Sequence, residues 1–140
     1  MRIETVLGVG LFVLLTQAAH ADALRVVVTD VEESRGEIRL ALFDSVEAFE
    51  NDGAPHLARI AEAASDQVTF VLEGVTPGAY AIKLFHDVNS NGELDRNMMN
   101  MPKERYGFSN NAGRFGPPSW VDAVFEVGRD TATEINIKLR

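Results

Sequence analysis

Six short stretches of the chain alternate hydrophobic and polar residues, which is the pattern of β-strands that bury one face. The clearest is 36–43 (GEIRLALF), in which Ile38, Leu40 and Leu42 point to one side. The other stretches are 24–30, 67–72, 79–86, 120–127 and 131–139. We expect 24–30 to pair with 36–43 through the turn-rich segment 32–36 (EESRG).

The strands do not alternate with helices, so they predict an all-β fold. The expected architecture is an antiparallel immunoglobulin-like or transthyretin-like β-sandwich of six to seven strands with one long loop. One or two short helical turns are expected beside it. Segment 45–51 (SVEAFEN) begins with Ser45 as a helix N-cap, and 56–64 (HLARIAEAA) has good helix formers at helical spacing. The alternative for 56–64 is an irregular sheet edge.

The first residues predict a signal peptide. A short basic start precedes the apolar run 6–16 (VLGVGLFVLLT), which is shorter than the roughly 20 residues that span a bilayer. The small-residue pattern at 19–21 (AHA) places the expected cleavage before Asp22. Residues 1–21 are therefore a predicted signal peptide and residues 22–140 a single domain. We expect export to the periplasm or the medium, with no membrane anchor after cleavage.

Composition narrows the chemistry. The sequence has no cysteine, which excludes disulfides, thiolate metal ligands and thiol nucleophiles. Its formal net charge of −8 argues against nucleic acid as a partner, because phosphates are bound by Lys and Arg. An exported domain without disulfides must rest on its own core or on a bound ion. A carbohydrate or a protein partner is left open.

The stretch 87–119 interrupts the strand pattern, and its beginning has the spacing of a calcium-binding loop. Oxygen-bearing side chains recur at alternate positions and again four residues later: Asp87, Asn89, Asn91 and Asp95. Gly92 permits the sharp turn, and Glu93 would offer its backbone carbonyl. Only two carboxylates contribute, so the predicted affinity for Ca²⁺ is weak, with a Kd of ~10⁻⁴–10⁻³ M.

Two features oppose the calcium interpretation. Met98 stands where a calcium loop carries a bidentate Glu, so Asp95 or Glu104 would have to supply the missing oxygens. The tetrapeptide 89–92 (NSNG) is also typical of an ordinary turn whose Asn side chains bond the backbone. A metal-free turn is therefore the alternative, and the sequence does not decide between the two.

Aromatic and amide side chains follow in the same stretch. Segments 106–111 (YGFSNN) and 115–120 (FGPPSW) suit a carbohydrate site, in which Tyr106, Phe108 and Trp120 would stack on sugar rings. The favoured alternative is that Tyr106, Phe108 and Phe115 pin the loop onto the sandwich. The candidate ligand-binding or loop-anchoring residues are His86, Tyr106, Phe108, Ser109, Asn110 and Asn111.

The sequence evidence for a copper site or a catalytic site is weaker. Met98, Met99 and Met101 could form a soft Cu(I) site with His86, but methionines that fill gaps under a loop are commoner. His86 lies beside Asp87, yet there is no nucleophile motif and no set of three zinc ligands. We therefore assign no catalytic residue, and we expect the His86 imidazole to hold the loop by hydrogen bonds.

The order of these motifs resembles a known exported bacterial family. Pro77-Gly78-x-Tyr80-Ala81 leads into 86–95 (HDVNSNGELD), followed by 102–104 (PKE), 106–111 (YGFSNN) and 116–118 (GPP). From about Leu24 onward, the chain is similar to domain of unknown function 2141. The resemblance implies export and a sandwich related to transthyretin-like or carboxypeptidase regulatory domains, and it implies no activity. Met101 departs from the family pattern, which has Gly before the Pro-x-Glu block.

The function expected from these observations is that of an exported, non-enzymatic binding or accessory domain. Its loop would be ordered around Ca²⁺ or around itself. The alternatives are a carbohydrate-recognition module and a transthyretin-like hydrolase.

Overall fold

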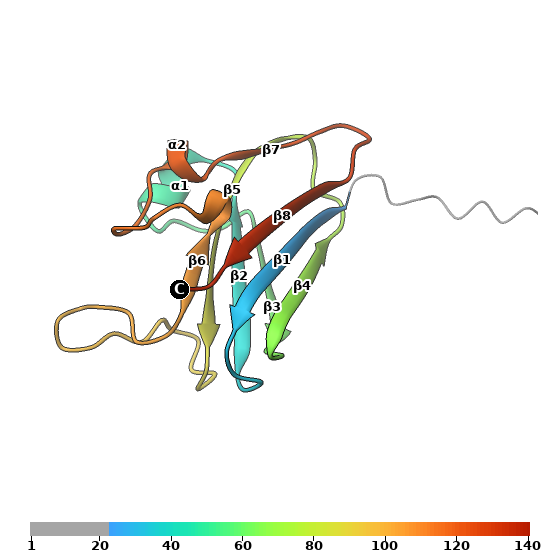
Figure 1. Cartoon of the computed structure of the whole chain (residues 1–140). Helices are drawn as coiled ribbons and strands as arrows, with labels where there is room; N and C mark the ends of the chain where they lie inside the picture. Colours follow the sequence, from blue (N-terminus) through green and yellow to red (C-terminus); the bar gives the residue numbers. More distant parts are fainter. Residues whose placement is uncertain (1–22) are drawn as a thin grey trace, which may run out of the picture.

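Two β-sheets packed face to face form the body of the protein in the computed structural model, which describes residues 23–140 (Figure 1). The three-stranded sheet has the order β4-β1-β8, and the five-stranded sheet has the order β3-β2-β5-β6, with β7 also paired to β5. The strands are β1 (Leu24–Val31), β2 (Glu37–Phe43), β3 (Leu57–Glu62), β4 (Asp66–Leu72), β5 (Gly78–Asp87), β6 (Tyr106–Phe108), β7 (Phe125–Val127) and β8 (Thr133–Lys138). The predicted signal peptide lies outside the described residues.

The expected all-β class is confirmed, and so is the short helix after β2. Helix α1 (Val46–Glu50) begins at Ser45, whose hydroxyl accepts a hydrogen bond from the Ala48 N–H at 3.2 Å. A second short helix, α2 (Trp120–Ala123), and a 3-10 turn, η1 (Ser109–Asn111), follow the long loop.

The predicted pairing of the first two strands is wrong. Strand β1 pairs antiparallel with β4 and parallel with β8, whereas β2 pairs with β3 and β5 in the other sheet. Turn residues suit an arch between sheets as well as a hairpin, so the composition of 32–36 could not separate the two. The parallel pair also means that the sandwich is not wholly antiparallel, and the eight strands within residues 23–140 exceed the predicted six to seven.

Two element assignments also need correction. Segment 56–64 contains strand β3 rather than a helix, because pairing with β2 overrides its helix propensity. Leu57 and Ala61 pack against the core. A helix would also have placed them on one face, because residues four apart share a face in a helix as well as in a strand. Segment 120–127 begins as α2 and becomes β7 only at Phe125, and the Val121 side chain is 81% exposed.

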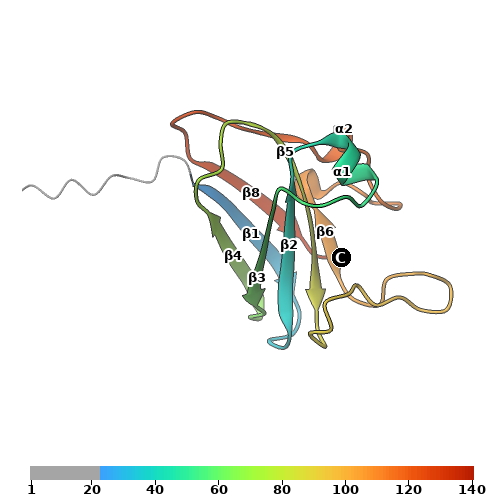
Figure 2. The ribbon, with the colours of Figure 1, turned by 180° about the vertical axis from the view of Figure 1, so that it is seen from behind.

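The main core lies between the two sheets and is built from the inward side chains of the alternating strands. A smaller cluster of Phe43, Phe49, Ala81 and Ala123 lies under α1 and α2. Between β5 and β6 the chain leaves the body altogether, and the 88–105 loop projects well beyond both sheets (Figures 1 and 2).

Candidate functional site

The last two residues of β5 point to opposite faces of the sheet and start the projecting loop. His86 faces the core with Ile82 and Leu84, is 2% exposed, and lies with Nε2 2.7 Å from the Arg35 carbonyl. A carbonyl only accepts, so Nε2 carries the proton and donates it. Asp87 faces the other way and is fully buried. The structure therefore does not bring His86 to the exposed methionines with which a copper site would need it.

Asp87 is an ionised carboxylate held by three donors. Its Oδ2 accepts from the Arg39 Nε and the Gly92 N–H, both at 2.8 Å, and its Oδ1 accepts from the Asn91 N–H at 3.1 Å. Burial alone would raise the pKa of Asp87, but the hydrogen bonds from Gly92, Arg39 and Asn91 outweigh it and hold the pKa below its ordinary value. The negative charge of Asp87 thus fixes the start of the loop to β2.

Gly36 makes the close approach at this corner possible. Its φ is +76°, and a Cβ added there would lie 2.2 Å from the Asp87 backbone carbonyl. Any side chain at position 36 would therefore collide with the backbone that carries the buried carboxylate. Neither Arg39 nor Gly36 had a local sequence signal that linked it to Asp87.

The remaining candidate calcium ligands converge on Asp95. Its two carboxylate oxygens accept from the side-chain amides of Asn89 at 2.6 Å and Asn91 at 2.7 Å. The Asn91 Oδ1 in turn accepts from the Glu93 N–H at 3.0 Å, which is an Asx turn, and the Glu93 side chain is exposed. Asp87 does not join this group, because its oxygens face the backbone and Arg39.

Glu104 folds back to close the base of the loop. Its two carboxylate oxygens accept from the Val88 N–H and the Asp95 N–H, both at 3.1 Å. The Lys103 N–H also donates to the Asp95 carbonyl at 2.7 Å. Glu104 thus bridges the two ends of the loop with its oxygens on backbone donors. Within residues 23–140, no group of three or more His, Asp or Glu side chains is placed to hold a metal ion.

The block after the loop ties β5, α2 and β8 together. The buried Ser109 Oγ accepts from the Ile82 N–H at 2.9 Å and donates to the Ala123 carbonyl at 2.5 Å. The Asn110 amide donates to the carbonyls of Asp122 and Val124. The Asn111 Oδ1 accepts from the Lys138 N–H at 2.8 Å. All three polar side chains therefore bond to backbone groups of other elements.

The sequence also matches the model of a known protein family. The model that describes uncharacterized proteins conserved in bacteria (DUF2141) matches residues 26–136, which is most of the chain. The chain belongs to this family. No curated protein and no solved structure matches the sequence.

In this DUF2141 protein the aromatic rings near the loop contact one another. Tyr106 and Phe108 lie edge to face with centroids 5.8 Å apart, and Trp120 lies edge to face with Phe49 at 5.9 Å. All three predicted sugar-stacking rings are half-buried. The carbohydrate hypothesis therefore stays a prediction, and the internal packing of the rings does not add to it.

The predicted roles of Phe115 and the methionines are wrong. Phe115 does not pin the loop, because it is 96% exposed. Met98, Met99 and Met101 do not fill a gap under the loop either, since they lie at its tip with exposed fractions of 105%, 83% and 59%. The loop turns away from the sandwich after Glu104 and Asp95 have closed its base, and nothing in residues 23–140 covers the tip.

Glu104→Ala is expected to open the base of the loop while leaving the sandwich folded. The Val88 and Asp95 N–H groups would lose their acceptor, so their hydrogen exchange should accelerate by about tenfold, equivalent to roughly 1.4 kcal/mol of local stability. Exchange measured by NMR would resolve both amides. Glu93→Ala removes an exposed loop carboxylate of the same kind and should leave both rates unchanged; equal acceleration in the two variants would contradict the closing role of Glu104.

Proposed function

We propose that this DUF2141 protein is an exported, non-enzymatic binding or accessory domain whose binding element is the 88–105 loop. One observation carries the proposal: the loop projects from the sandwich, yet its base is held by Asp87, Asp95 and Glu104. Binding sites are commonly carried on loops positioned by a rigid scaffold. A loop already held in one shape also loses less conformational entropy when it binds.

The buried polar residues support a binding domain over a hydrolase. His86 and Ser109 are the side chains best suited to acid–base or nucleophilic chemistry, and both are almost fully buried. Each is already bonded to backbone groups of the sandwich. Their arrangement is that of residues that hold strands and loop together.

We propose that the sandwich is transthyretin-like rather than immunoglobulin-like. In the constant-type immunoglobulin order the first two strands lie in one sheet. Here β1 and β2 lie in different sheets, and β1 pairs with the last strand in parallel.

The proposal that the protein is exported rests on the sequence of residues 1–21. N-terminal sequencing of protein recovered from a periplasmic fraction would test cleavage before Asp22.

Hydrogen exchange of the free protein tests the proposed binding element. The Asn91 and Gly92 N–H groups donate to Asp87 and the Asp95 N–H donates to Glu104, so all three should exchange more slowly than in an unstructured peptide. Exchange of all three at the rate of an unstructured peptide would remove the preordered loop and, with it, the proposed function.

We also propose weak Ca²⁺ binding by the loop, because Asn89, Asn91 and Asp95 converge on one point. In the free loop the Asn89 and Asn91 N–H groups face the Asp95 carboxylate, so both amides would rotate on binding to place their oxygens beside Asp95 and the Glu93 carbonyl. At ten times the Kd, Ca²⁺ should add about 1.4 kcal/mol to stability and raise the melting temperature by a few degrees. Thermal melting with and without millimolar Ca²⁺ measures this. Asp95→Asn should abolish the shift, and an unchanged wild-type melting temperature would exclude the site.

A further inference from the structure

The tip of the 88–105 loop is apolar and internally ordered. The Asn97 Oδ1 accepts from the Met99 N–H at 2.9 Å and the Met101 N–H at 3.0 Å, and the Asn97 N–H donates to the Met101 carbonyl at 2.9 Å. Arg96 and Pro102 form a β-bridge just below these bonds. The three methionine side chains are therefore displayed to solvent by a defined turn.

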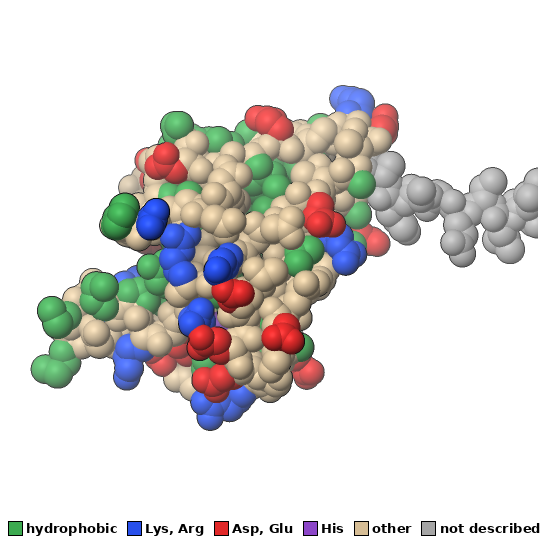
Figure 3. Space-filling model, viewed as in Figure 1, with side chains coloured by type: hydrophobic (Ala, Val, Ile, Leu, Met, Phe, Trp, Pro, Cys, Tyr) green, Lys and Arg blue, Asp and Glu red, His purple; other side chains and the backbone are tan. Residues whose placement is uncertain are grey.

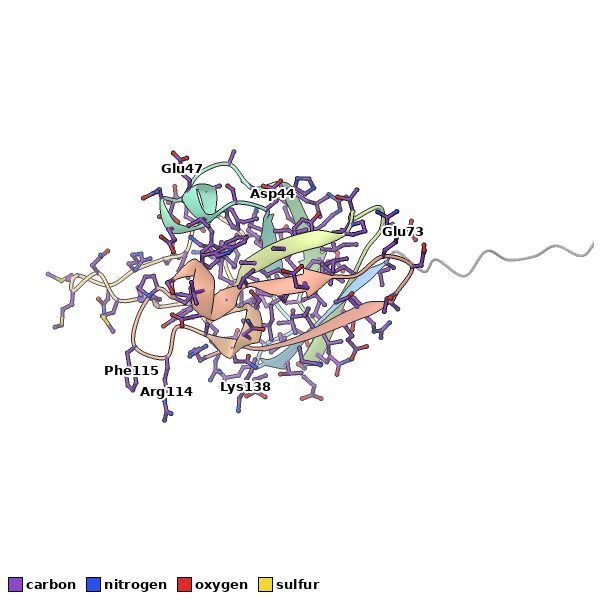
Figure 4. The ribbon with its side chains drawn as sticks, turned by 90° about the horizontal axis from the view of Figure 1, so that it is seen from above. Asp44, Glu47, Glu73, Arg114, Phe115 and Lys138 are labelled. Carbon is purple, nitrogen blue, oxygen red and sulfur yellow. The ribbon has the colours of Figure 1, made fainter. Side chains whose placement is uncertain are left out.

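A second exposed apolar side chain projects from a separate turn of the chain. Phe115 lies in the turn between Gly113 and Gly116, and the Arg114 guanidinium carbon is 5.6 Å from the centre of its ring. Viewed from above, Phe115, Arg114 and Lys138 point outward from one side of the sandwich, and the sulfur-bearing loop extends at an angle to them, to the left (Figure 4). Next to Phe115 the surface has a shallow hollow lined by Asn111, Arg114, Lys138 and Arg140.

The charge of this region is opposite to that of the rest of the protein. The outer half of the loop, 96–103, carries Arg96 and Lys103 and no carboxylate, and the Phe115 turn adds Arg114, whereas the chain as a whole has a formal charge of −8. Space-filling shows hydrophobic side chains at the end of the projecting loop and Lys or Arg side chains between it and the body (Figure 3). Apolar tips and flanking cations thus occur together at one end of an otherwise acidic molecule.

We propose that the methionine tip and the Phe115 turn dock this protein onto a bilayer surface that carries anionic headgroups. The apolar side chains would enter the boundary between headgroups and acyl chains, while Arg96, Lys103 and Arg114 contact lipid phosphates. Lipid fits better than a protein partner because the apolar groups stand on two convex projections, which a deformable surface accommodates without matching pockets. The acidic remainder of the protein is repelled by the same surface, which fixes the orientation.

This inference rests on the proposed binding role of the loop and names its partner. No helix within residues 23–140 is long and apolar enough to cross a bilayer. The apolar run 6–16 would bind vesicles by itself, so the experiment uses residues 22–140, which contain both sheets and the whole core described above. Co-sedimentation is measured with vesicles of phosphatidylethanolamine and phosphatidylglycerol, and with vesicles of phosphatidylcholine alone.

The protein should sediment with the anionic vesicles, and binding should weaken with added salt. A variant with M98S, M99S, M101S and F115S should lose more than about tenfold in affinity because its apolar insertion is removed. A variant with R96Q, K103Q and R114Q should also lose more than tenfold, since each Lys or Arg near an anionic surface contributes about fivefold. The control I60T with V71T changes two exposed side chains on β3 and β4 and should bind normally. Melting temperatures close to wild type show that each variant is folded.

Several results would overturn the proposal. These are absence of binding to anionic vesicles, equal binding to phosphatidylcholine, or the same loss in the control as in the methionine and Phe115 variant. Self-association that disappears in that variant, without vesicle binding by wild type, would identify a second copy of the chain as the partner. In each of these cases, loop amides that stay protected from exchange would leave the proposed binding function in place. Loop amides that exchange freely would remove both the proposed binding function and the proposed docking onto a bilayer.

Discussion

Asp87→Ala is expected to lower the free energy of unfolding by about 3–5 kcal/mol, the range seen when one partner of a buried ion pair is removed. Asp87 is fully buried, and its loss would leave the Gly92 N–H, the Asn91 N–H and the Arg39 guanidinium without their acceptor. Urea denaturation followed by the fluorescence of Trp120, the single tryptophan, would measure the change.

Two further variants separate charge from shape at Asp87. Asp87→Asn keeps the shape but cannot accept from all three donors with a full negative charge, so it should lose most of the same stability. Asp52→Asn is the matched control, because Asp52 also pairs with a cation, Lys83 at 2.8 Å, but its side chain is 89% exposed. An exposed pair of this kind contributes about 0–1 kcal/mol. Losses of similar size at positions 87 and 52 would show that the buried carboxylate is not what fixes the loop.

The pH dependence follows from the direction of the pKa shift. The pKa of Asp87 is lower in the folded protein than in the unfolded chain, so folding favours the ionised form. Its contribution is complete above the unfolded pKa of about 3.9 and is lost as the pH falls through the folded pKa. The gap in stability between wild type and Asp87→Asn should therefore be constant near neutral pH and narrow in strong acid.

Periodicity predicted the strands whose burial alternates along the chain. Strand β2 and the end of β8 alternate buried with exposed or partly exposed residues. This alternation in burial appears in the local sequence as a hydrophobic period of two residues. Which strand pairs with which is a property of the whole sandwich. The parallel pairing of β1 with β8 joins opposite ends of the sequence and leaves no local pattern.

The candidate site was predictable only where its contacts are local. The spacing of Asp87, Asn89, Asn91 and Asp95 located the ordered turn, because these side chains bond one another or nearby backbone. Arg39 holds Asp87 from 48 residues away, and no local rule finds such a partner. The exposure of the methionines was not predicted for a different reason. Met side chains are usually buried, and a loop tip that exposes three of them is an exception.

Ser109→Ala should lower the free energy of unfolding by about 2–4 kcal/mol, although it removes a single oxygen atom. Pairing between β5 and β6 covers only Lys83–Phe85, so the Ile82 N–H lies just past the end of β6 and is met by the Ser109 Oγ instead. The same hydroxyl donates to the Ala123 carbonyl at the end of α2. Alanine would leave both buried backbone groups without a partner, and the site has no exposure through which water could replace it.

Ser119→Ala is the matched control, because the Ser119 hydroxyl is exposed and, among residues 23–140, bonds the nearby Asp122 carboxylate alone, at 2.8 Å. Its loss should cost no more than about 1 kcal/mol. Hydrogen exchange adds a readout specific to Ser109, since the Ile82 amide should lose protection in Ser109→Ala and keep it in Ser119→Ala. If the Ile82 amide stayed protected and stability were unchanged, the Ser109 hydroxyl would not be the link between β5 and the end of α2.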